Sequence, residues 1–269
     1  MFTLVNNRGV SFYKSSLLRS KHAFSTRLGG ISELEHTKEL NLAFNLGDSH
    51  LTVLFNLQRF ANAVGVEANY IVSVPQVHSN EIRLIEKRQA GAGYNKHVLF
   101  TCDGYVTQEK DIPLGVKTAD CVPILLEARD DNGKVMAVSA VHAGWRGTAL
   151  RISEEAVEKL CSLGAKKENI YAAIGPAIDV CCYEVGEDFT NEIKTKLGQN
   201  YEVNFIKRIE NGKLFANIKG MNFDILTSCG VPRENIDMCS LCTCCNPDLF
   251  YSHRRQKGVR GSMLSIICK

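Results

Sequence analysis

Three residues that could bind a metal ion or attack a substrate each stand beside an apolar stretch. They are His78 in PQVHSN, Cys121 in TADCVPI and His142 in AVHAGWRG. The gaps between them are far longer than those of a zinc finger, so they meet only if the fold brings three strand ends together. Two imidazoles and one thiolate would leave a tetrahedral Zn²⁺ with one open position, as in catalytic zinc sites, and Cu²⁺ accepts the same ligands.

The same residues also have other interpretations. Cys121 could be a nucleophile with His142 as its base, since a cysteine hydrolase also needs a deprotonated sulfur near an imidazole. A histidine after a strand is often only a packed or surface residue, and Cys121 could be a core thiol. Asp120 could accept a hydrogen bond from an imidazole or be a plain turn carboxylate. The sequence leaves these alternatives open.

Cysteines are unusually frequent, and several of them cluster. The chain has 11, including the pair at 181–182 and the segment CSLCTCC at 239–245. The spacing of Cys239 and Cys242 suggests structural zinc or an iron–sulfur cluster, but no second C-x-x-C pair follows at the usual distance. We therefore expect a reduced, partly buried thiol cluster, whose role the sequence does not reveal.

Hydrophobic periodicity predicts the elements that must position these side chains. The predicted helices span 51–66, 148–164, about 186–198 and 219–230. Strands are predicted at 134–147 and 169–178, a strand that runs into a loop at Pro75 is predicted in 69–80, and the segments 97–108 and 113–129 are β-rich and interrupted by turns. Because the predicted helices and strands are interleaved in this way, the sequence favours a layered domain with mixed sheets over a purely parallel doubly wound sheet. Neither GxGxxG after a strand nor GxxxxGK[ST] occurs, so nucleotide-phosphate loops of those types are absent.

Composition indicates an ordinary globular protein. The chain has 269 residues, is 45% hydrophobic and 23% charged, and carries a net charge of +3. This charge is too mild to indicate nucleic-acid binding, and we interpret the basic clusters at 87–89 and 252–260 as solvated surface. No apolar run approaches the ~18 residues of a membrane helix, and the N-terminus lacks the pattern of a secretory signal. These features predict a cytoplasmic protein that binds neither nucleic acid nor membrane.

The motifs together resemble the YfiH family of laccase-domain proteins, whose members have been called multicopper polyphenol oxidases and, more recently, purine nucleoside phosphorylases. The resemblance rests on PQVHS, TADCVPILL, AVHAGWRGT, AAIGPAIDVCCYEVGED and FYSHRR, and it extends from residue 24 to the C-terminus. It implies an α+β fold, namely a single-domain four-layer α/β/β/α sandwich with mixed sheets over residues 1–269. That fold is related to bacterial cysteine-dependent toxin deamidases.

The resemblance also implies an activity and its residues. His78, Cys121 and His142 match the family's metal ligands and would form the catalytic centre with Zn²⁺, or alternatively with Cu²⁺. The implied reaction is phosphorolysis of adenosine, inosine and 5′-methylthioadenosine to the base and a pentose 1-phosphate, with adenosine deamination as a side activity. The partners would be small nucleosides and phosphate, and the chain would be a monomer or a homodimer.

Further positions are candidates for holding substrate. Guanidinium groups bind phosphate in a bidentate manner, which makes Arg146 and Arg254 the candidates for that anion. Other residues that match the family pattern are Arg27, Asn41, Asp48 and Asp103. Two departures put family arginines in doubt here: Asn56-Leu57 replaces Asn-Arg, and Arg260-Gly261 replaces a closing Gly-Arg.

Trp145 is the only tryptophan in the chain, and it lies between two glycines. We expect Gly144 and Gly147 to permit backbone geometry that turns His142 toward a metal. Trp145 would then close the pocket wall, either stacked on a purine or as a core plug beneath the loop.

Two other functions are alternatives. One is a copper-dependent phenol oxidase, but a multicopper centre needs more histidine ligands than the seven in this chain, which has no HxH pair. The other is a cysteine hydrolase or amidase that acts in peptidoglycan editing.

Overall fold

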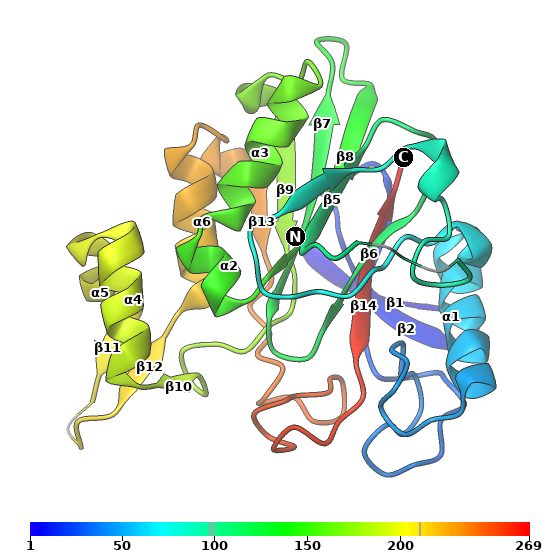
Figure 1. Ribbon diagram of the computed structural model, residues 1–269, viewed down its shortest axis with the longest axis horizontal. Helices are drawn as coiled ribbons and strands as arrows, with labels where there is room; N and C mark the ends of the chain where they lie inside the picture. The colour runs from blue at the N-terminus through cyan, green and yellow to red at the C-terminus, as the bar shows by residue number, and fades with distance from the viewer. Residues whose placement is uncertain (97, 99, 210) are drawn as a thin grey trace.

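Two β-sheets stack face to face, and helices cover both outer faces (Figure 1). The computed structural model describes residues 1–96, 98, 100–209 and 211–269. The order of layers, helix–sheet–sheet–helix, is the predicted four-layer sandwich. Three apolar cores separate the four layers, because each sheet is buried on both of its faces.

The six-stranded sheet carries most of the candidate site. Its strands have the order β13-β9-β7-β8-β5-β4, with parallel pairs at the two edges and antiparallel pairs between them. On the central strand β7, Ile124 and Leu126 face the helices, whereas Leu125 faces the other sheet. The strands are β4 (Ile82–Leu84), β5 (Gly104–Thr107), β7 (Val122–Arg129), β8 (Val135–Ala143), β9 (Ile170–Ile174) and β13 (Ile236–Met238), and the covering helices are α2 (Trp145–Ala149), α3 (Ile152–Ser162) and α6 (Ile218–Ser228).

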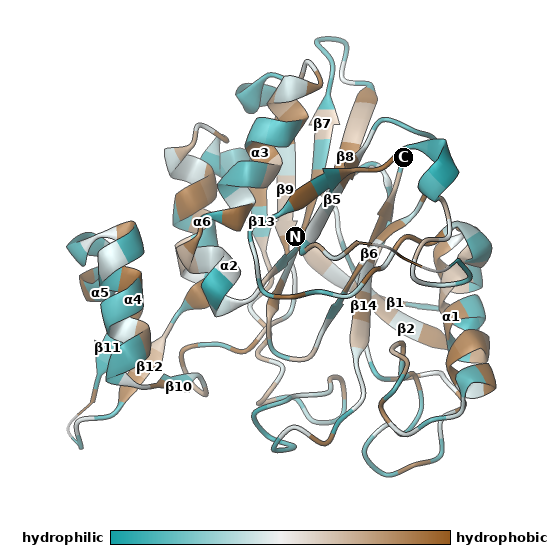
Figure 2. Ribbon diagram, in the orientation of Figure 1, coloured by the Kyte–Doolittle hydropathy of each residue, from teal (hydrophilic) through white to brown (hydrophobic). Residues whose placement is uncertain are grey.

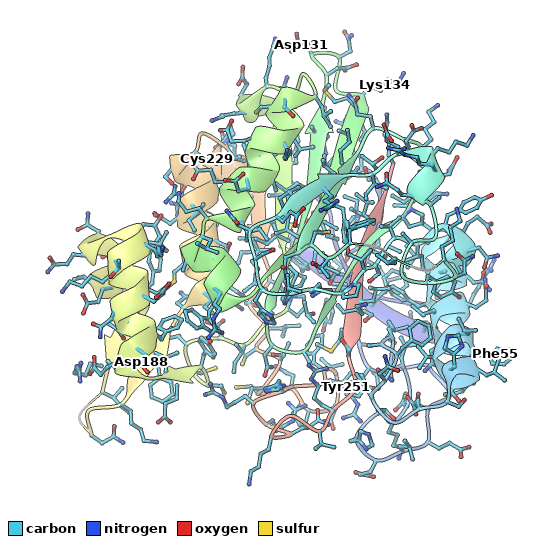
Figure 3. All side chains as sticks on the ribbon, viewed as in Figure 1. Phe55, Asp131, Lys134, Asp188, Cys229 and Tyr251 are labelled. Atoms are coloured by element: carbon cyan, nitrogen blue, oxygen red, sulfur yellow. The ribbon has the colours of Figure 1, made fainter. Side chains whose placement is uncertain are left out.

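The five-stranded sheet is antiparallel throughout, with the order β1-β2-β3-β14-β6. Helix α1 (His50–Val64) covers its outer face; Ser49 caps the first turn and Gly65 ends the helix in the left-handed region, at φ 83°. Phe55 lies on the outward face of this helix and is 60% exposed (Figure 3). The strands are β1 (Phe2–Asn7), β2 (Val10–Ser15), β3 (Lys21–Ser25), β6 (Leu114–Thr118) and β14 (Met263–Cys268).

A small lobe lies beside the sandwich, at the left of Figure 1. It contains a three-stranded sheet and two helices: β10 (Glu184–Val185), β11 (Ile206–Arg208), β12 (Leu214–Ala216), α4 (Glu187–Leu197) and α5 (Gln199–Phe205). Phe189 of α4 contacts Trp145, with ring centroids 5.4 Å apart, so this lobe packs beside the HAGWRG segment. Helices in the lobe and elsewhere carry hydrophilic outer bands, whereas the central strands are apolar (Figure 2).

The predicted elements agree with the structure in most places. The helices predicted at 51–66, about 186–198 and 219–230 are confirmed as α1, α4 and α6. The helix predicted at 148–164 is broken into α2 and α3 at Arg151, whose φ is 59°. The described residues also form single turns of 3₁₀ helix, which are η1 (Ala68–Tyr70), η2 (Lys87–Gln89), η3 (Lys167–Asn169) and η4 (Arg233–Asn235).

The segment 69–80 was predicted as a strand that runs into a loop at Pro75; the loop agrees with the structure, but the strand before it is wrong. Residues 69–70 belong to the 3₁₀ turn η1, Val72 forms one isolated bridge to Leu114, and the rest of the segment is loop. Its apolar side chains are buried in two different cores, Ile71 beside α1 and Val74 between the sheets. This burial explains the alternating apolar pattern, although the segment has no ladder of β-sheet hydrogen bonds. In the predicted strand 97–108, residues 97 and 99 lie outside the described residues. None of the described helices is long and apolar enough to cross a lipid bilayer.

Candidate functional site

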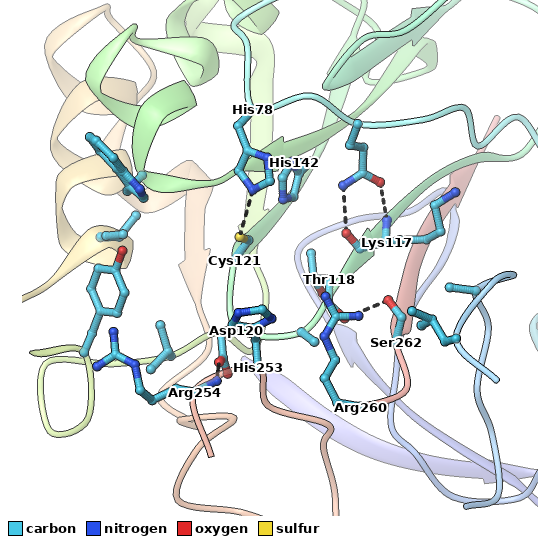
Figure 4. Close-up of a pocket in the computed structure, with 18 residues that line it drawn as sticks. His78, Lys117, Thr118, Asp120, Cys121, His142, His253, Arg254, Arg260 and Ser262 are labelled. Atoms are coloured by element: carbon cyan, nitrogen blue, oxygen red, sulfur yellow. Dashed lines mark hydrogen bonds between the residues drawn. The ribbon is translucent and has the colours of Figure 1, made fainter. Parts of the chain in front are cut away.

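His78, Cys121 and His142 converge at one end of the six-stranded sheet (Figure 4). Nε2 of His78 lies 3.9 Å from Sγ of Cys121, and the two imidazole rings are nearly perpendicular, with centroids 4.9 Å apart. One potential ligand atom from each residue lies within 4.8 Å of the others. The three residues therefore form a cluster with the composition of an open zinc site.

A buried carboxylate, Asp103, positions both histidines. It accepts hydrogen bonds from the backbone N–H groups of Val77, His78 and Ser79 at 3.2, 2.9 and 2.7 Å. These bonds hold the turn in which His78 has a φ of 61°, a conformation that costs free energy for a residue with a side chain. The same carboxylate lies 2.8 Å from Nδ1 of His142, which leaves Nε2 of that ring as its free ligand atom.

Of the two roles that the sequence left open for Asp120, the structure favours that of a loop carboxylate. Its carboxylate accepts hydrogen bonds from the hydroxyls of Thr243 and Ser252 at 2.6 and 3.0 Å and from the backbone N–H of Arg254 at 2.7 Å. It thus fixes the C-terminal loop rather than a histidine ring. The acceptor for the imidazole N–H is Asp103, which the sequence offered only as a family match.

Electrostatic coupling favours charge separation within the cluster. Burial alone would raise the pKa of the Cys121 thiol, but the neighbouring His142 and His78 lower it to about 6. Burial would lower the pKa of His142, but the Cys121 sulfur and the Asp103 carboxylate raise it to about 9. At neutral pH the sulfur is therefore a thiolate, which is the form that binds metal or attacks an electrophile.

Gly144 makes room for this cluster. A Cβ atom at this position would lie 2.6 Å from Cδ2 of His78 and 3.5 Å from Sγ of Cys121. Gly147 likewise approaches the backbone oxygen of Ser79, which a Cβ would meet at 2.9 Å. Gly144 has an ordinary φ of −66°, so these glycines are required for close approach and not, as the sequence suggested, for unusual backbone angles.

The cluster opens into a pocket of about 590 Å³, a size suited to a small ligand. One wall is apolar and aromatic, with Trp145, Ile178 and Tyr183. Lys117 and Arg260 lie on the opposite side of the pocket, whereas Arg254 lies beside Tyr183, with its guanidinium 5.3 Å from the centroid of that ring (Figure 4). His253 also lines the pocket.

Lys117 and Arg260, which are both half-buried, bring positive charge to this pocket. Neither forms an ion pair with any carboxylate in the described part of the chain. Nε of Arg260 is buried without a hydrogen-bond partner among those residues, and burial lowers the pKa of this guanidinium. Burial likewise lowers the pKa of Lys117 to about 8. Uncompensated cations of this kind are suited to bind an anion.

Sequence reasoning missed Lys117 and left Arg260 in doubt. Lys117 stands four residues before Cys121, in VKTADC, and this proximity was the available signal. In the family pattern the glycine comes before the arginine, whereas here Arg260 comes before Gly261. The Arg260 side chain nevertheless lines the pocket. The reversed Arg-Gly order therefore did not remove the guanidinium from the site.

The other predicted substrate residues have different positions. Arg254 lines the pocket, and its guanidinium donates to the carbonyls of Cys182 and Glu184. Arg146 is not among the lining residues; its guanidinium lies over the Trp145 ring, 4.2 Å from the centroid.

Arg27 and Asn41, the other two predicted substrate residues, also lie outside the pocket lining. Arg27 stacks over the buried Tyr251 ring at 4.8 Å (Tyr251 is labelled in Figure 3). Asn41 is fully buried, and its amide bonds to Ala43, Asp48 and Ser262. Its amide therefore supports the pocket wall, since Ala43 and Ser262 do line the pocket.

Comparisons with known proteins identify the family. Residues 21–269 match the family model described as multi-copper polyphenol oxidoreductase laccase. The chain belongs to this family. It is 35% identical to adenosine deaminase RL5 from an unknown prokaryotic organism over 235 residues, 87% of this chain and 88% of that protein.

A second relative and a solved structure extend the comparison. The chain is 31% identical to purine nucleoside phosphorylase YlmD of Bacillus subtilis (strain 168) over 248 residues, 91% of this chain and 86% of that protein. The crystal structure of the hypothetical protein YfiH from Bacillus licheniformis superposes with a TM-score of 0.89 at 29% identity, covering 99% of this chain and 98% of that one. The resemblance to the YfiH family and the predicted fold class are thereby confirmed.

Proposed function

We propose that this protein is a zinc-dependent purine nucleoside phosphorylase with adenosine deaminase side activity. The observation that carries the proposal is the pocket itself, in which Lys117 and Arg260 present unpaired positive charge beside the cluster of His78, Cys121 and His142. Relatives named purine nucleoside phosphorylase and adenosine deaminase support it.

The donor set fits zinc. Two imidazole nitrogens and a thiolate within 4.8 Å of one another match the ligands of catalytic zinc, and Asp103 orients His142 as such carboxylates do. His78, Cys121 and His142 would hold the ion. When bound, zinc would supply Lewis-acid activation of water for deamination of adenine. Copper would accept the same ligands, and metal analysis of the purified protein distinguishes the two.

The chain's own residues account for the phosphate requirement. In phosphorolysis the bond between C1′ and the purine nitrogen breaks, a phosphate oxygen bonds to C1′, and the base leaves with the bonding electrons and takes up a proton. Lys117 and Arg260 would hold phosphate as positive charge develops on the ribose. The apolar wall formed by Trp145 and Tyr183 would contact the purine.

A phosphate-dependent assay tests the proposal. Purified protein is incubated with adenosine, inosine or 5′-methylthioadenosine, with and without inorganic phosphate, and the products are separated by chromatography. We expect free base and a pentose 1-phosphate in equal amounts, and only when phosphate is present. Release of base without phosphate, or no release from any of the three nucleosides, would contradict the phosphorylase assignment.

A cysteine hydrolase is the second candidate, and one observation favours it. Cys121, His142 and Asp103 form a thiolate–imidazole–carboxylate series, with a thiol pKa lowered to about 6. A hydrolase of this kind would be active without metal and would form an acyl bond at Cys121. Mass spectrometry of the metal-free protein after treatment with an activated acyl amide tests this, and absence of an adduct on Cys121 excludes it.

The remaining parts of the proposal concern the whole chain. We propose that residues 1–269 act as one catalytic domain, because the pocket includes residues from Ala43 to Ser262. A cytoplasmic location accords with eleven cysteines that are all free thiols. A monomer or a homodimer remains the proposed assembly.

A further inference from the structure

Four cysteine sulfurs gather in a second cluster outside the three-residue site. They belong to Cys181 and Cys182, in the loop after β9, and to Cys242 and Cys245, in the C-terminal loop. All four sulfurs lie within 4.8 Å of one another. Sγ of Cys245 lies 3.4 Å from that of Cys181 and 3.3 Å from that of Cys182, so none of these pairs is a disulfide.

This spacing suits a single tetrahedral ion. With Zn–S bonds of about 2.3 Å, the sulfurs of a tetrahedral zinc site lie about 3.8 Å apart. An iron–sulfur cluster would need its cysteine sulfurs farther apart, because several irons and bridging sulfides must fit between them. Cys242 and Cys245 have the C-x-x-C spacing of zinc ligands, and the structure supplies the second pair from Cys181 and Cys182.

The two loops are already fixed relative to one another by other contacts. Cys242 forms an isolated parallel bridge with Ala177, and the N–H of Thr243 donates to the carbonyl of Ala177 at 3.0 Å. The buried Lys219 pairs with Asp179 at 2.6 Å and donates to the carbonyl of Cys239 at 2.8 Å. These contacts hold the backbones of the two cysteine-bearing loops near one another.

Positive groups surround the cluster, as a tetrathiolate site requires. Four thiolates around Zn²⁺ carry a net charge of −2, which nearby cations stabilise. The Arg254 guanidinium donates to the carbonyl of Cys182 at 3.2 Å, and the Arg255 guanidinium donates to those of Thr243 and Cys244 at 2.7 and 2.9 Å. Cys181 and Cys245 are exposed, so an ion has a path into the site.

We propose that Cys181, Cys182, Cys242 and Cys245 bind a structural zinc ion that joins the loop after β9 to the C-terminal loop. Binding releases the thiol protons and forms four Zn–S bonds, with no change in oxidation state. The ion would position two residues that line the pocket, Tyr183 and Arg254. Tyr183 follows Cys182 in the chain, and the Arg254 guanidinium donates to the carbonyl of Cys182. The site is distinct from the three-residue cluster and fills all four positions with protein ligands, as structural zinc sites do.

The test uses the full chain with the other metal site removed. Cys121→Ala eliminates one ligand of the three-residue cluster, so zinc that remains in this variant after desalting belongs elsewhere. We expect about one zinc per chain in Cys121→Ala by elemental analysis, and near zero when Cys242→Ser and Cys245→Ser are added. Cys161→Ser, which changes a half-buried thiol on α3, is the matched control and should retain the zinc.

Several results would overturn the proposal. They are a zinc content near zero in Cys121→Ala, an unchanged content after the Cys242 and Cys245 substitutions, iron in place of zinc, or a disulfide within the cluster in freshly purified protein. If the triple variant does not fold, alkylation of the wild-type protein provides the result. Cys181 and Cys245 should resist iodoacetamide at least about 10-fold more in zinc-loaded protein than after chelation, and equal reactivity contradicts the proposal.

Discussion

Nδ1 of His142 lies 2.8 Å from Oδ1 of Asp103, and the same carboxylate accepts three backbone N–H groups from the turn that carries His78. One buried side chain thus links two segments that are far apart in the sequence. Any change to Asp103 should therefore alter both histidines together.

Asp103→Asn should weaken zinc binding by about 10- to 100-fold, the usual effect of losing a carboxylate that orients a histidine ligand. The N–H₂ group of the new asparagine also cannot accept the hydrogen bonds that the backbone N–H groups donate to Asp103. Competition titration with a zinc-binding dye measures the affinity. Asp131→Asn is the control, because Asp131 is an exposed residue at the far end of the molecule from the site (Figure 3) and should leave the affinity unchanged.

The stability of the metal-free protein should depend on pH through Asp103. Although burial raises the pKa of this carboxyl, hydrogen bonds from His142 and Ser79 lower it to about 2, whereas it is near 4 in an unfolded chain. A lowered folded pKa contributes stability above pH 4, and this contribution is lost as the pH falls toward 2. The contribution is about 2 kcal/mol at neutral pH.

Urea unfolding in the presence of a chelator measures this contribution. The difference in unfolding free energy between the wild type and Asp103→Asn should be larger at pH 6 than at pH 3. A difference that stays constant across this range would show that the carboxylate's charge does not stabilise the fold.

Arg260→Ala should raise the KM for phosphate by about 10- to 100-fold, as expected for losing a hydrogen bond to a charged group. The KM for the nucleoside should change much less, because the guanidinium is assigned to the anion. Initial rates at varied phosphate and fixed inosine measure both constants. Arg27→Ala is the matched control, since Arg27 lies outside the pocket lining. Equal changes in both variants would remove Arg260 from phosphate binding.

Trp145 should report on ligand binding, because it is the only tryptophan and lines the pocket. Its ring already contacts Phe189 and the Arg146 guanidinium, so it is part of the wall as well as a candidate purine contact. We expect adenosine to change the intrinsic fluorescence in a saturable manner. Fluorescence that does not respond to a nucleoside shown by calorimetry to bind would place the purine away from Trp145.

Local sequence patterns determined much of this fold. The helices α1, α4 and α6 follow from apolar residues at helical spacing, and the buried strands β7, β8 and β9 follow from apolar runs bounded by turns. The short motifs around His78, Cys121 and His142 likewise mark the candidate ligands by residue type alone. Such features depend on residues close together in the chain, which the sequence displays directly.

The tertiary structure alone decided which distant side chains meet. Asp103, not Asp120, supports the imidazole, and Lys117 and Arg260 supply the pocket's unpaired charge. The tertiary structure also brought Cys181 and Cys182 together with Cys242 and Cys245, whereas the sequence had indicated Cys239 and Cys242 as the candidate metal-binding pair. Sheet order and loop packing set these contacts, and neither is encoded in the spacing of neighbouring residues.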